Sequence, residues 1–322
     1  MEKSTHRVDV IQVKMRPHEN ADFLSLIEVY NYTVCVRTAD WKDGDLAAYI
    51  PPDSVVDTNR PEFAFLKTKD RQFERIRVKK LRGVISMGLL VPAPPNSKEG
   101  DDVAELLGVT HYEPSVESIT GGDNVGGPNL VIPKYDIDSL RRYLSCFIPG
   151  ETVYISEKIH GANSRYVFHN GQMYCGSRTN WKVEDERSIW WQALKNTPSI
   201  IEFCQCYPDF VLFGEVYGQV QNLRYDIKSG VRFAAFDILN GNRYLDVSRF
   251  LGFVHDYEIP RVPTIAIEGF DWENIQGYAE GQSLIASHVR EGCVVRPVIE
   301  RTHPTIGRVI LKLVGNGYYQ KG

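Results

Sequence analysis

The chain has 322 residues, a length that predicts about two domains, each large enough to bury its own core. Its 37 Lys and Arg against 41 Asp and Glu give a formal charge of −4, with 43% hydrophobic residues. These ordinary values exclude chain-wide disorder, a collagen-like fibre and a globally basic histone-like protein. Because no apolar run reaches about 18 residues and no secretory signal pattern occurs, we expect no membrane span and a cytosolic location.

The first hundred residues have an all-β pattern. Short runs in 6–56 alternate β-branched or aromatic residues with polar ones, and Gly, Pro, Asp and Asn separate them. A further strand is expected over 73–81. This pattern predicts a small closed barrel, and PHENADFLSLIEVYNYTVCVRTAD resembles the opening of the OB-fold barrels of tRNA-binding modules. We therefore expect residues 1–112 to form an OB-fold nucleic-acid-binding domain.

The rest of the chain predicts a linker and a mixed domain. Residues 113–135 include TGGDNVGGPN and are rich in Gly, Ser, Pro and Asn, which is typical of an interdomain linker. A short helix over 138–144 and a clear one over 184–196 separate strand runs such as ETVYISEKI and DFVLFGEVYG. Residues 136–322 should therefore form an α+β domain with mainly antiparallel strands.

Six short motifs follow one another in this second half. They are EKIHGAN around Lys158, GSR ending at Arg178, FGEVYG around Glu215, FAAFDI from Phe233, EGCVVRP around Glu291 and VILKLV around Lys312. In this order they resemble the covalent nucleotidyltransferase superfamily of ATP-dependent ligases and capping enzymes, and the KIHG form resembles RNA ligases. The likeness covers roughly residues 150–315. With the N-terminal barrel, the architecture resembles the small RNA ligases typified by those of Deinococcus and Naegleria.

The residue types fit the chemistry that such enzymes need. Lys158 ends an apolar strand, where desolvation and neighbouring cations would favour a neutral amine able to attack the α-phosphorus of ATP. Glu215 and Glu291 are candidate ligands for the water shell of Mg²⁺ or Mn²⁺. Taken singly, each residue has an ordinary alternative: a surface lysine beside a turn, or a solvated glutamate at the end of a strand. We expect Lys158, Glu215, Glu291 and Lys312 to be catalytic.

The resemblance implies further roles and a fold. It implies an OB-fold barrel followed by an ATP-grasp-like nucleotidyltransferase core, with ATP and a divalent ion as cofactors. It also implies that Phe233 stacks on adenine, although a core phenylalanine is the alternative, and that Asn163 contacts the nick. Nucleotide contacts are expected from Glu157 to the exocyclic amine of adenine, from Ile159, from Arg178 to a phosphate or the ribose, and from Lys312 to the α-phosphate. Arg296 is a weaker candidate for a phosphate contact, and Asp237 is expected to have a structural role.

Departures from the superfamily pattern separate the alternatives. DNA ligases and capping enzymes usually carry Asp where this chain has His160, and they place an OB-fold after the last motif. Many relatives have a second lysine where Val314 stands. The favoured hypothesis is an ATP-dependent RNA ligase that forms lysyl-AMP and seals nicks in RNA or RNA–DNA duplexes, without an obligate protein partner. A capping guanylyltransferase, a DNA ligase and a non-catalytic OB-fold nucleic-acid-binding protein stay open as alternatives.

A basic segment in the barrel offers a nucleic-acid contact. On a strand over 73–81, Arg75, Arg77 and Lys79 would share one face. Such a face could follow a phosphate backbone, or it could be a solvated face of the barrel.

Overall fold

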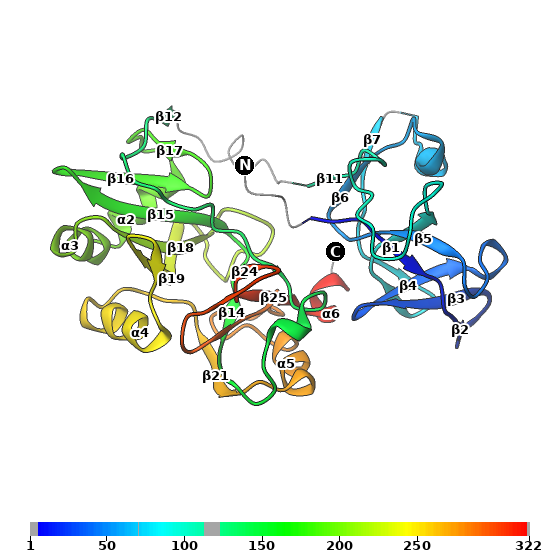
Figure 1. The fold of residues 1–322 in the computed structure, drawn as a ribbon. Helices are drawn as coiled ribbons and strands as arrows, with labels where there is room; N and C mark the ends of the chain where they lie inside the picture. Colours follow the sequence, from blue (N-terminus) through cyan, green and yellow to red (C-terminus); the bar gives the residue numbers. More distant parts are fainter. Residues whose placement is uncertain (1–5, 70, 113–122, 321–322) are drawn as a thin grey trace. The chain divides into compact units, whose positions relative to one another are not determined.

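The computed structural model describes residues 6–69, 71–112 and 123–320, and the chain divides into two compact units (Figure 1). Unit 1 spans Met1–Pro114 and unit 2 spans Ser115–Gly322. No helix in the described ranges is both long and apolar enough to cross a membrane. Residues 113–122 of the predicted linker lie outside the described residues.

Unit 1 is built almost entirely from short antiparallel strands, as its alternating sequence predicts. One sheet has the order β1-β5-β10 and a second the order β2-β3-β4, while β11-β6-β7 and the hairpin β8-β9 complete the unit. Its core contains Val10, Ala48, Ile50 and Val91, which come from the first of these sheets. The strands are β1 (Asp9–Gln12), β2 (Met15–His18), β3 (Ala21–Val29), β4 (Tyr32–Arg37), β5 (Leu46–Ile50), β6 (Ser54–Asp57), β7 (Phe73–Arg75), β8 (Lys79–Leu81), β9 (Val84–Ser86), β10 (Leu89–Pro92) and β11 (Thr110–His111).

The basic segment of unit 1 differs from the single strand expected over 73–81. It forms β7 and β8, which residues 76–78 separate. Ile76 keeps backbone hydrogen bonds with Asp53 and Ser54, and its side chain enters the core of unit 1. Arg75 is ion-paired with Asp53 at 2.6 Å, and its guanidinium lies 3.9 Å from the centre of the Tyr112 ring. Arg77 and Lys79 are exposed. The three cations therefore do not form one alternating face, and the charge of Arg75 is already matched by a carboxylate.

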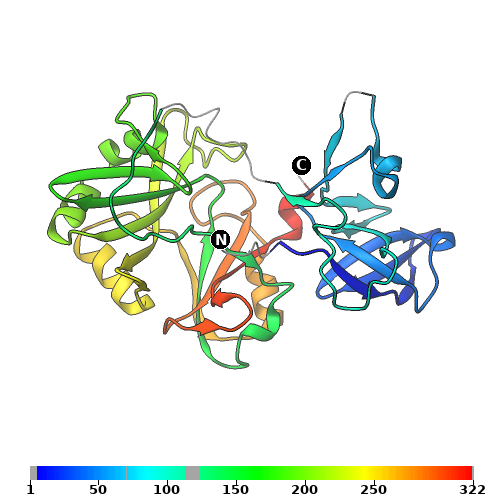
Figure 2. The ribbon, with the colours of Figure 1, turned by 45° about the horizontal axis from the view of Figure 1, so that its top comes forward.

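Unit 2 contains a seven-stranded antiparallel sheet with helices on one face (Figures 1 and 2). Helices α2 (Ile189–Asn196), α3 (Ser199–Cys206) and α4 (Val247–Asp256) pack Trp190, Phe203 and Phe250 against it. The predicted helix over 184–196 thus begins only at Ile189. In order across the sheet, the strands are β12 (Asn124–Val125), β17 (Trp181–Lys182), β16 (Gln172–Ser177), β15 (Ala162–His169), β18 (Phe210–Gly218), β19 (Val231–Asn240) and β20 (Arg243–Tyr244).

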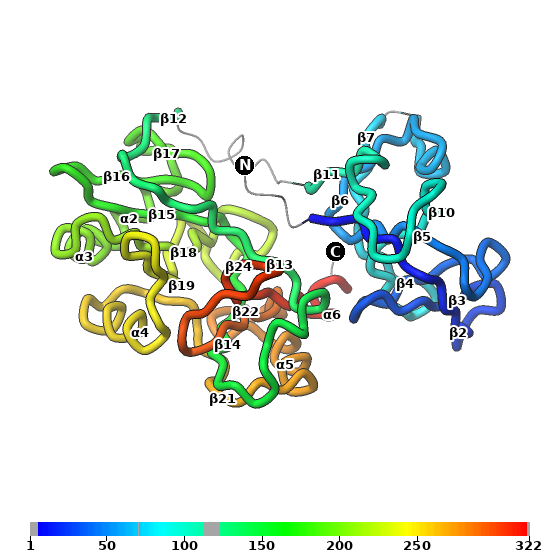
Figure 3. The backbone as a smooth tube through the Cα atoms, viewed as in Figure 1, coloured from blue at the N-terminus to red at the C-terminus, as the bar shows by residue number. Residues whose placement is uncertain are grey.

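A five-stranded sheet completes unit 2 (Figure 3). Helix α5 (Trp272–Ala279) packs on it, and the short α6 (Asn316–Tyr319) follows its strand β25. The helix predicted over 138–144 is wrong: strand β13 begins there, and a 3₁₀ turn, Leu144–Cys146, follows. In order across the sheet, the strands are β13 (Asp138–Ser139), β25 (Leu311–Val314), β22 (Gly292–Pro297), β14 (Thr152–Lys158) and β21 (Thr264–Gly269), and the hairpin β23 (Thr302–His303) and β24 (Gly307–Arg308) lies between β22 and β25 in the chain.

The described part of the predicted linker, residues 123–135, packs on unit 2. Strand β12 pairs with β17, and the Tyr135 ring lies 5.0 Å from that of Phe213. The Tyr135 hydroxyl donates a hydrogen bond of 2.7 Å to Asp237. Leu130, Ile132 and Tyr135 of this stretch therefore pack into the apolar cluster that also contains Phe213, whereas Val131 is exposed.

A buried ion cluster joins the two sheets of unit 2. Asp237 on β19 of the seven-stranded sheet pairs with Arg296 on β22 of the five-stranded sheet at 3.0 Å and with Arg308 on β24 at 2.6 Å. Burial alone would raise the pKa of Asp237, but the two guanidinium groups and Tyr135 hold it below its usual value. The weaker expectation that Arg296 contacts a phosphate is therefore wrong, because its charge is already paired with the buried carboxylate of Asp237. Asp237 has the structural role that was expected.

Candidate active site

The end of β14 and the start of β22 bring the predicted nucleophile to a carboxylate. Lys158 pairs in register with Gly292, so Glu291 stands beside it. The Lys158 ammonium donates to Glu291 Oε2 at 2.7 Å, and His160 Nδ1 lies 3.4 Å from the same oxygen. Both residues are largely buried, since 21% of the Lys158 side chain and 10% of the Glu291 side chain are exposed. In this state the carboxylate favours the ammonium form of Lys158.

Glu215 reaches the same place from the seven-stranded sheet. It lies on β18 opposite Asn163 of β15, and its Oε1 accepts a 3.0 Å hydrogen bond from the Gly161 N–H. A Cβ atom on Gly161 would stand 2.2 Å from the Val216 carbonyl oxygen, so only glycine allows the two backbones to approach this closely. The turn that follows Lys158 is therefore hydrogen-bonded to the second carboxylate, Glu215, which keeps that carboxylate close to the predicted nucleophile.

The two carboxylates have opposite pKa shifts. Burial raises the pKa of Glu215 to about 8, the charge of Glu291 adds to that rise, and Lys158 opposes it. Burial would also raise the pKa of Glu291, but Lys158 and His160 outweigh it and lower that pKa to about 2. Near neutral pH the cluster therefore holds one ionised and one largely protonated carboxyl group. Such a difference in pKa between two neighbouring carboxyl groups is typical of active sites.

Two predicted phosphate-binding cations lie around this cluster. Arg178 is within electrostatic reach of Glu215 and has Asp136 at 3.4 Å. Lys312 on β25 pairs with Val294, which pairs with Ser156 on β14, so Lys312 shares the sheet face of Ser156 and Lys158. The structure thus brings Lys158, Glu215 and Glu291 together and places Lys312 on the same face of the five-stranded sheet as Lys158.

Glu157 differs from its predicted role in reading adenine. It follows Ser156 on the strand, so its side chain lies on the opposite face from that of Lys158, and only 1% of the residue is exposed. Its carboxylate accepts hydrogen bonds from the Ser283 hydroxyl at 2.5 Å and the Leu284 N–H at 2.7 Å. Both carboxylate oxygens are therefore used to hold a loop.

Phe233 also differs from its predicted role in stacking. It pairs with Val216, packs edge-on against Tyr166 at 5.4 Å between ring centres, and belongs to the core under the helices. Glu215 lies on the other face of the sheet, since it pairs with Ala234. Phe233 is therefore a core residue.

A half-buried aromatic residue that the sequence analysis did not single out, Phe236, lies on the same face of β19 as Ala234, the partner of Glu215. A β-bulge near Phe213 adds one residue to β19, and Phe236 joins the apolar cluster of Ile159, Tyr225 and Ala234. Phe236 therefore packs against the apolar cluster that contains Ile159. The signal was present in the sequence as the second aromatic of FAAFDI. Because Phe233 and Phe236 are three residues apart, strand alternation places them on opposite faces, and Phe236 shares the face of Ala234 and Glu215.

The donor set fits a divalent ion held together with a substrate. Within the described ranges no group of three or more His, Cys, Asp and Glu side chains could enclose a metal. Glu215 and Glu291 supply two oxygen ligands instead. This suits Mg²⁺ or Mn²⁺, because Mg²⁺ is usually held by one or two carboxylates, several waters and substrate phosphates.

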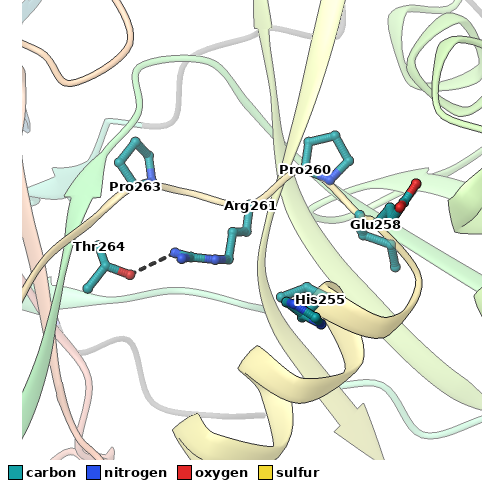
Figure 4. Close-up of a pocket in the computed structure, with 8 residues that line it drawn as sticks. His255, Glu258, Pro260, Arg261, Pro263 and Thr264 are labelled. Carbon is teal, nitrogen blue, oxygen red and sulfur yellow. Dashed lines mark hydrogen bonds between the residues drawn. The ribbon is translucent and has the colours of Figure 1, made fainter.

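A surface pocket elsewhere on unit 2 has no part in this cluster (Figure 4). There Arg261 already donates a 2.7 Å hydrogen bond to Thr264 Oγ1. None of the predicted functional residues lines it; its lining consists of Val254, His255, Glu258, Ile259, Pro260, Arg261, Pro263 and Thr264.

The raised pKa of Glu215 predicts a dependence of stability on pH. An unfolded chain gives up the Glu215 proton near pH 4.5, whereas the folded protein keeps it to about pH 8, so Glu215 lowers the stability of unit 2 progressively as the pH rises between these values. Glu215→Gln keeps an acceptor for Gly161 and removes the titration. We expect its melting temperature to exceed that of the wild type by about 5 °C at pH 8.5 and to match it at pH 4.5. Equal differences at both pH values would contradict the shift.

Comparison with known proteins agrees with both units. The RNA ligase family profile matches residues 151–314, about half of the chain, and an OB-fold domain profile matches residues 7–93. No curated protein matches the sequence.

Solved structures of Naegleria gruberi RNA ligase have the same fold. A variant with ATP and Mn is 23% identical with a TM-score of 0.85, and the match covers 98% of each chain. A variant with AMP and Mn is 22% identical with a TM-score of 0.86, covering 98% of this chain and 99% of that one. The form with PPi is 23% identical with a TM-score of 0.83 and 98% of each chain covered. With an N-terminal OB-fold, an α+β ligase domain and a family profile over half its length, the chain belongs to the RNA ligase family of enzymes.

Proposed function

We propose that this enzyme is an ATP-dependent RNA ligase that seals a 3′-OH to a 5′-phosphate through an AMP adduct on Lys158. The observation that carries the proposal is the cluster in which Lys158 contacts Glu291 and lies within electrostatic reach of Glu215. A non-catalytic binding protein would have no use for a buried lysine between two carboxylates with opposite pKa shifts.

In the first step, Lys158 Nζ bonds to the α-phosphorus of ATP. The bond from that phosphorus to the bridging oxygen breaks, pyrophosphate leaves, and the attacking amine passes one proton to water, so that the new P–N bond keeps one N–H. Before this attack the Lys158 ammonium must separate from Glu291 and lose a proton to water, because an ammonium group has no free electron pair. The 2.7 Å contact therefore corresponds to a resting state of the nucleophile.

The divalent ion would be held by Glu215 and Glu291, with water and phosphate oxygens as its other ligands. When bound, it neutralises negative charge on the phosphates. Lys312 and Arg178 supply fixed positive charge around the same place. Phe236 and Ile159 offer an apolar surface for the base.

The later steps act on the broken strand. The RNA 5′-phosphate displaces Lys158 from the AMP, and the 3′-OH then attacks the activated 5′-phosphate and releases AMP. Nicked RNA and RNA–DNA duplexes are the substrates we propose. Asn163 lies opposite Glu215 at the start of β15, which supports a contact with the strand end.

The first test separates the steps of the reaction. Lys158→Ala should form no labelled protein with α-labelled ATP and should seal no ordinary nick, because only the first step needs the amine. The same variant should still seal a nick whose 5′-end already carries AMP, at a rate within about 100-fold of the wild type. Its folding is checked by melting temperature. A Lys158→Ala protein that still takes up label would overturn the proposal.

The second test separates the two phenylalanines. Phe236→Ala should raise the Kd for ATP by about 10-fold, and Phe236→Tyr should raise it less, because stacking needs a flat ring. Phe233→Ala should instead reduce the free energy of unfolding by about 3–5 kcal/mol, as is typical when a large core side chain is truncated, and should therefore lower the melting temperature. Calorimetric ATP titration and thermal unfolding of both variants give the answer. Weaker ATP binding by Phe233→Ala at unchanged stability would reverse the assignment.

A further inference from the structure

The residue that follows Asn163 on the same face of β15 is Arg165, a buried arginine whose side chain has no acceptor. Arg165 follows Asn163 by two residues and pairs with Phe213, as Asn163 pairs with Glu215, so all these side chains share one face of the seven-stranded sheet. Arg165 is 6% exposed. Among the residues that the structure describes, it makes no hydrogen bond and no ion pair.

Such an environment is unusual for a guanidinium group. Buried charges are normally paired, because removing an unpaired ion from water costs several kcal/mol. Burial lowers the pKa of Arg165 to about 10, and no carboxylate contributes to that shift. Arg296 is buried in the same unit but is paired with Asp237 and Glu300. A buried arginine with a structural role therefore has carboxylate partners in this protein, whereas Arg165 has none.

The guanidinium is nevertheless held in position. Its central carbon lies 4.1 Å from the centre of the Trp181 ring. That ring is fixed in turn by close contact with the backbone at Gly127, where a Cβ atom would stand 2.2 Å from the indole nitrogen. Nε of Arg165 is enclosed without a partner, whereas its two NH₂ groups are not enclosed. The cation is thus rigid and its donors lack an acceptor.

A second unsatisfied atom lies beside it. Oδ1 of Asn163 is buried and accepts no hydrogen bond. Two residues along a strand separate these positions by about 6.6 Å. Donors from Arg165 and an acceptor from Asn163 at this spacing match a ligand with a negative group and a hydroxyl a few ångströms apart. An RNA strand offers this pair in every phosphate and its adjacent ribose hydroxyl.

We propose that Arg165, fixed on Trp181, is a binding residue for a phosphate of the RNA strand, and that the adjacent ribose hydroxyl donates to Asn163 Oδ1. The inference rests on the proposed function and deepens it. Arg165 lies on β15 in the seven-stranded sheet, whereas Lys158 lies on β14 in the five-stranded sheet, and we therefore assign its phosphate to the polynucleotide. One charge-assisted hydrogen-bonded contact of this kind accounts for a change in affinity of about 10- to 100-fold.

The test measures binding of a nicked RNA duplex by fluorescence anisotropy over a range of salt. Arg165→Met should raise Kd by about 10- to 100-fold and reduce the slope of log Kd against log salt by about one, as loss of one phosphate contact requires. Arg165→Lys keeps the charge and should restore most of the salt slope. Arg249→Met is the matched control, because Arg249 is exposed on α4 at the helix-covered side and should leave both quantities unchanged.

Thermal unfolding separates a binding role from a packing role. Because Met removes an unmatched buried charge, Arg165→Met should melt at the wild-type temperature or above it. A lower melting temperature together with unchanged RNA affinity in both Arg165 variants would show that Arg165 only packs on Trp181, and would overturn the proposal.

Two further measurements identify the phosphate. A loss confined to duplexes with a 5′-phosphate, compared with 5′-hydroxyl nicks, assigns Arg165 to the strand end, whereas equal loss on both assigns it to an internal phosphodiester. A higher KM for ATP in lysyl-AMP formation, with unchanged RNA affinity, would overturn the inference. Failure of the wild type to bind or seal RNA would instead refute the proposed function.

Discussion

The buried contact of Asp237 with Arg296 and Arg308 is the constraint on which the site depends. Asp237 belongs to the seven-stranded sheet, and the two arginines belong to the five-stranded sheet and its hairpin. Lys158 and Glu291 lie on the five-stranded sheet, whereas Glu215 lies on the seven-stranded one. A cluster that sets the separation of the sheets therefore also sets the separation of the nucleophile from its second carboxylate. Breaking such a cluster leaves uncompensated buried charge, which makes alternative sheet arrangements costly.

Within that frame, the site pairs Lys158 with one carboxylate and keeps the other carboxyl group protonated. Glu291 stays ionised because Lys158 faces it, and Glu215 stays protonated because it is buried near Glu291. The lowered pKa of Glu291 depends on Lys158 and His160, whereas the raised pKa of Glu215 comes first from burial, with Glu291 adding to it. Gly161 lets the backbone after Lys158 lie close to the backbone of Val216, and its N–H donates a hydrogen bond to Glu215. The turn after β14 of the five-stranded sheet is thereby bonded to β18 of the seven-stranded sheet. The chemistry that we propose begins when a polyanionic substrate and a cation change this balance.

Much of this could be predicted from the sequence, and the failures have definite causes. The order of the motifs and their resemblance to ATP-dependent ligases indicated that Lys158, Glu215 and Glu291 would meet, although Glu215 lies within β18 and not at its end. Strand alternation, however, gives only two faces and does not say which faces the nucleotide. Phe233 lies in the core under the helices, whereas Phe236, three residues later on β19, lies on the face of Glu215.

Other failures came from partners that are distant in sequence. Glu157 precedes the nucleophile directly, yet its carboxylate bonds a loop more than a hundred residues later. Arg75 fits an exposed basic strand until Asp53 and Tyr112 are seen beside it. Arg165 gave no signal at all, since a basic residue in an alternating strand normally faces solvent. Its burial without an acceptor is visible only in three dimensions.

The central claim is that the cluster exists to place AMP on one particular lysine. The most direct measurement is mass spectrometry of the wild-type protein after incubation with ATP and Mg²⁺ in the absence of RNA, with proteolysis and peptide mapping of the adduct. The account predicts one AMP per chain, linked to Nζ of Lys158, and its release when pyrophosphate is added. An adduct on another residue, or none in a protein that seals nicked RNA, would contradict it.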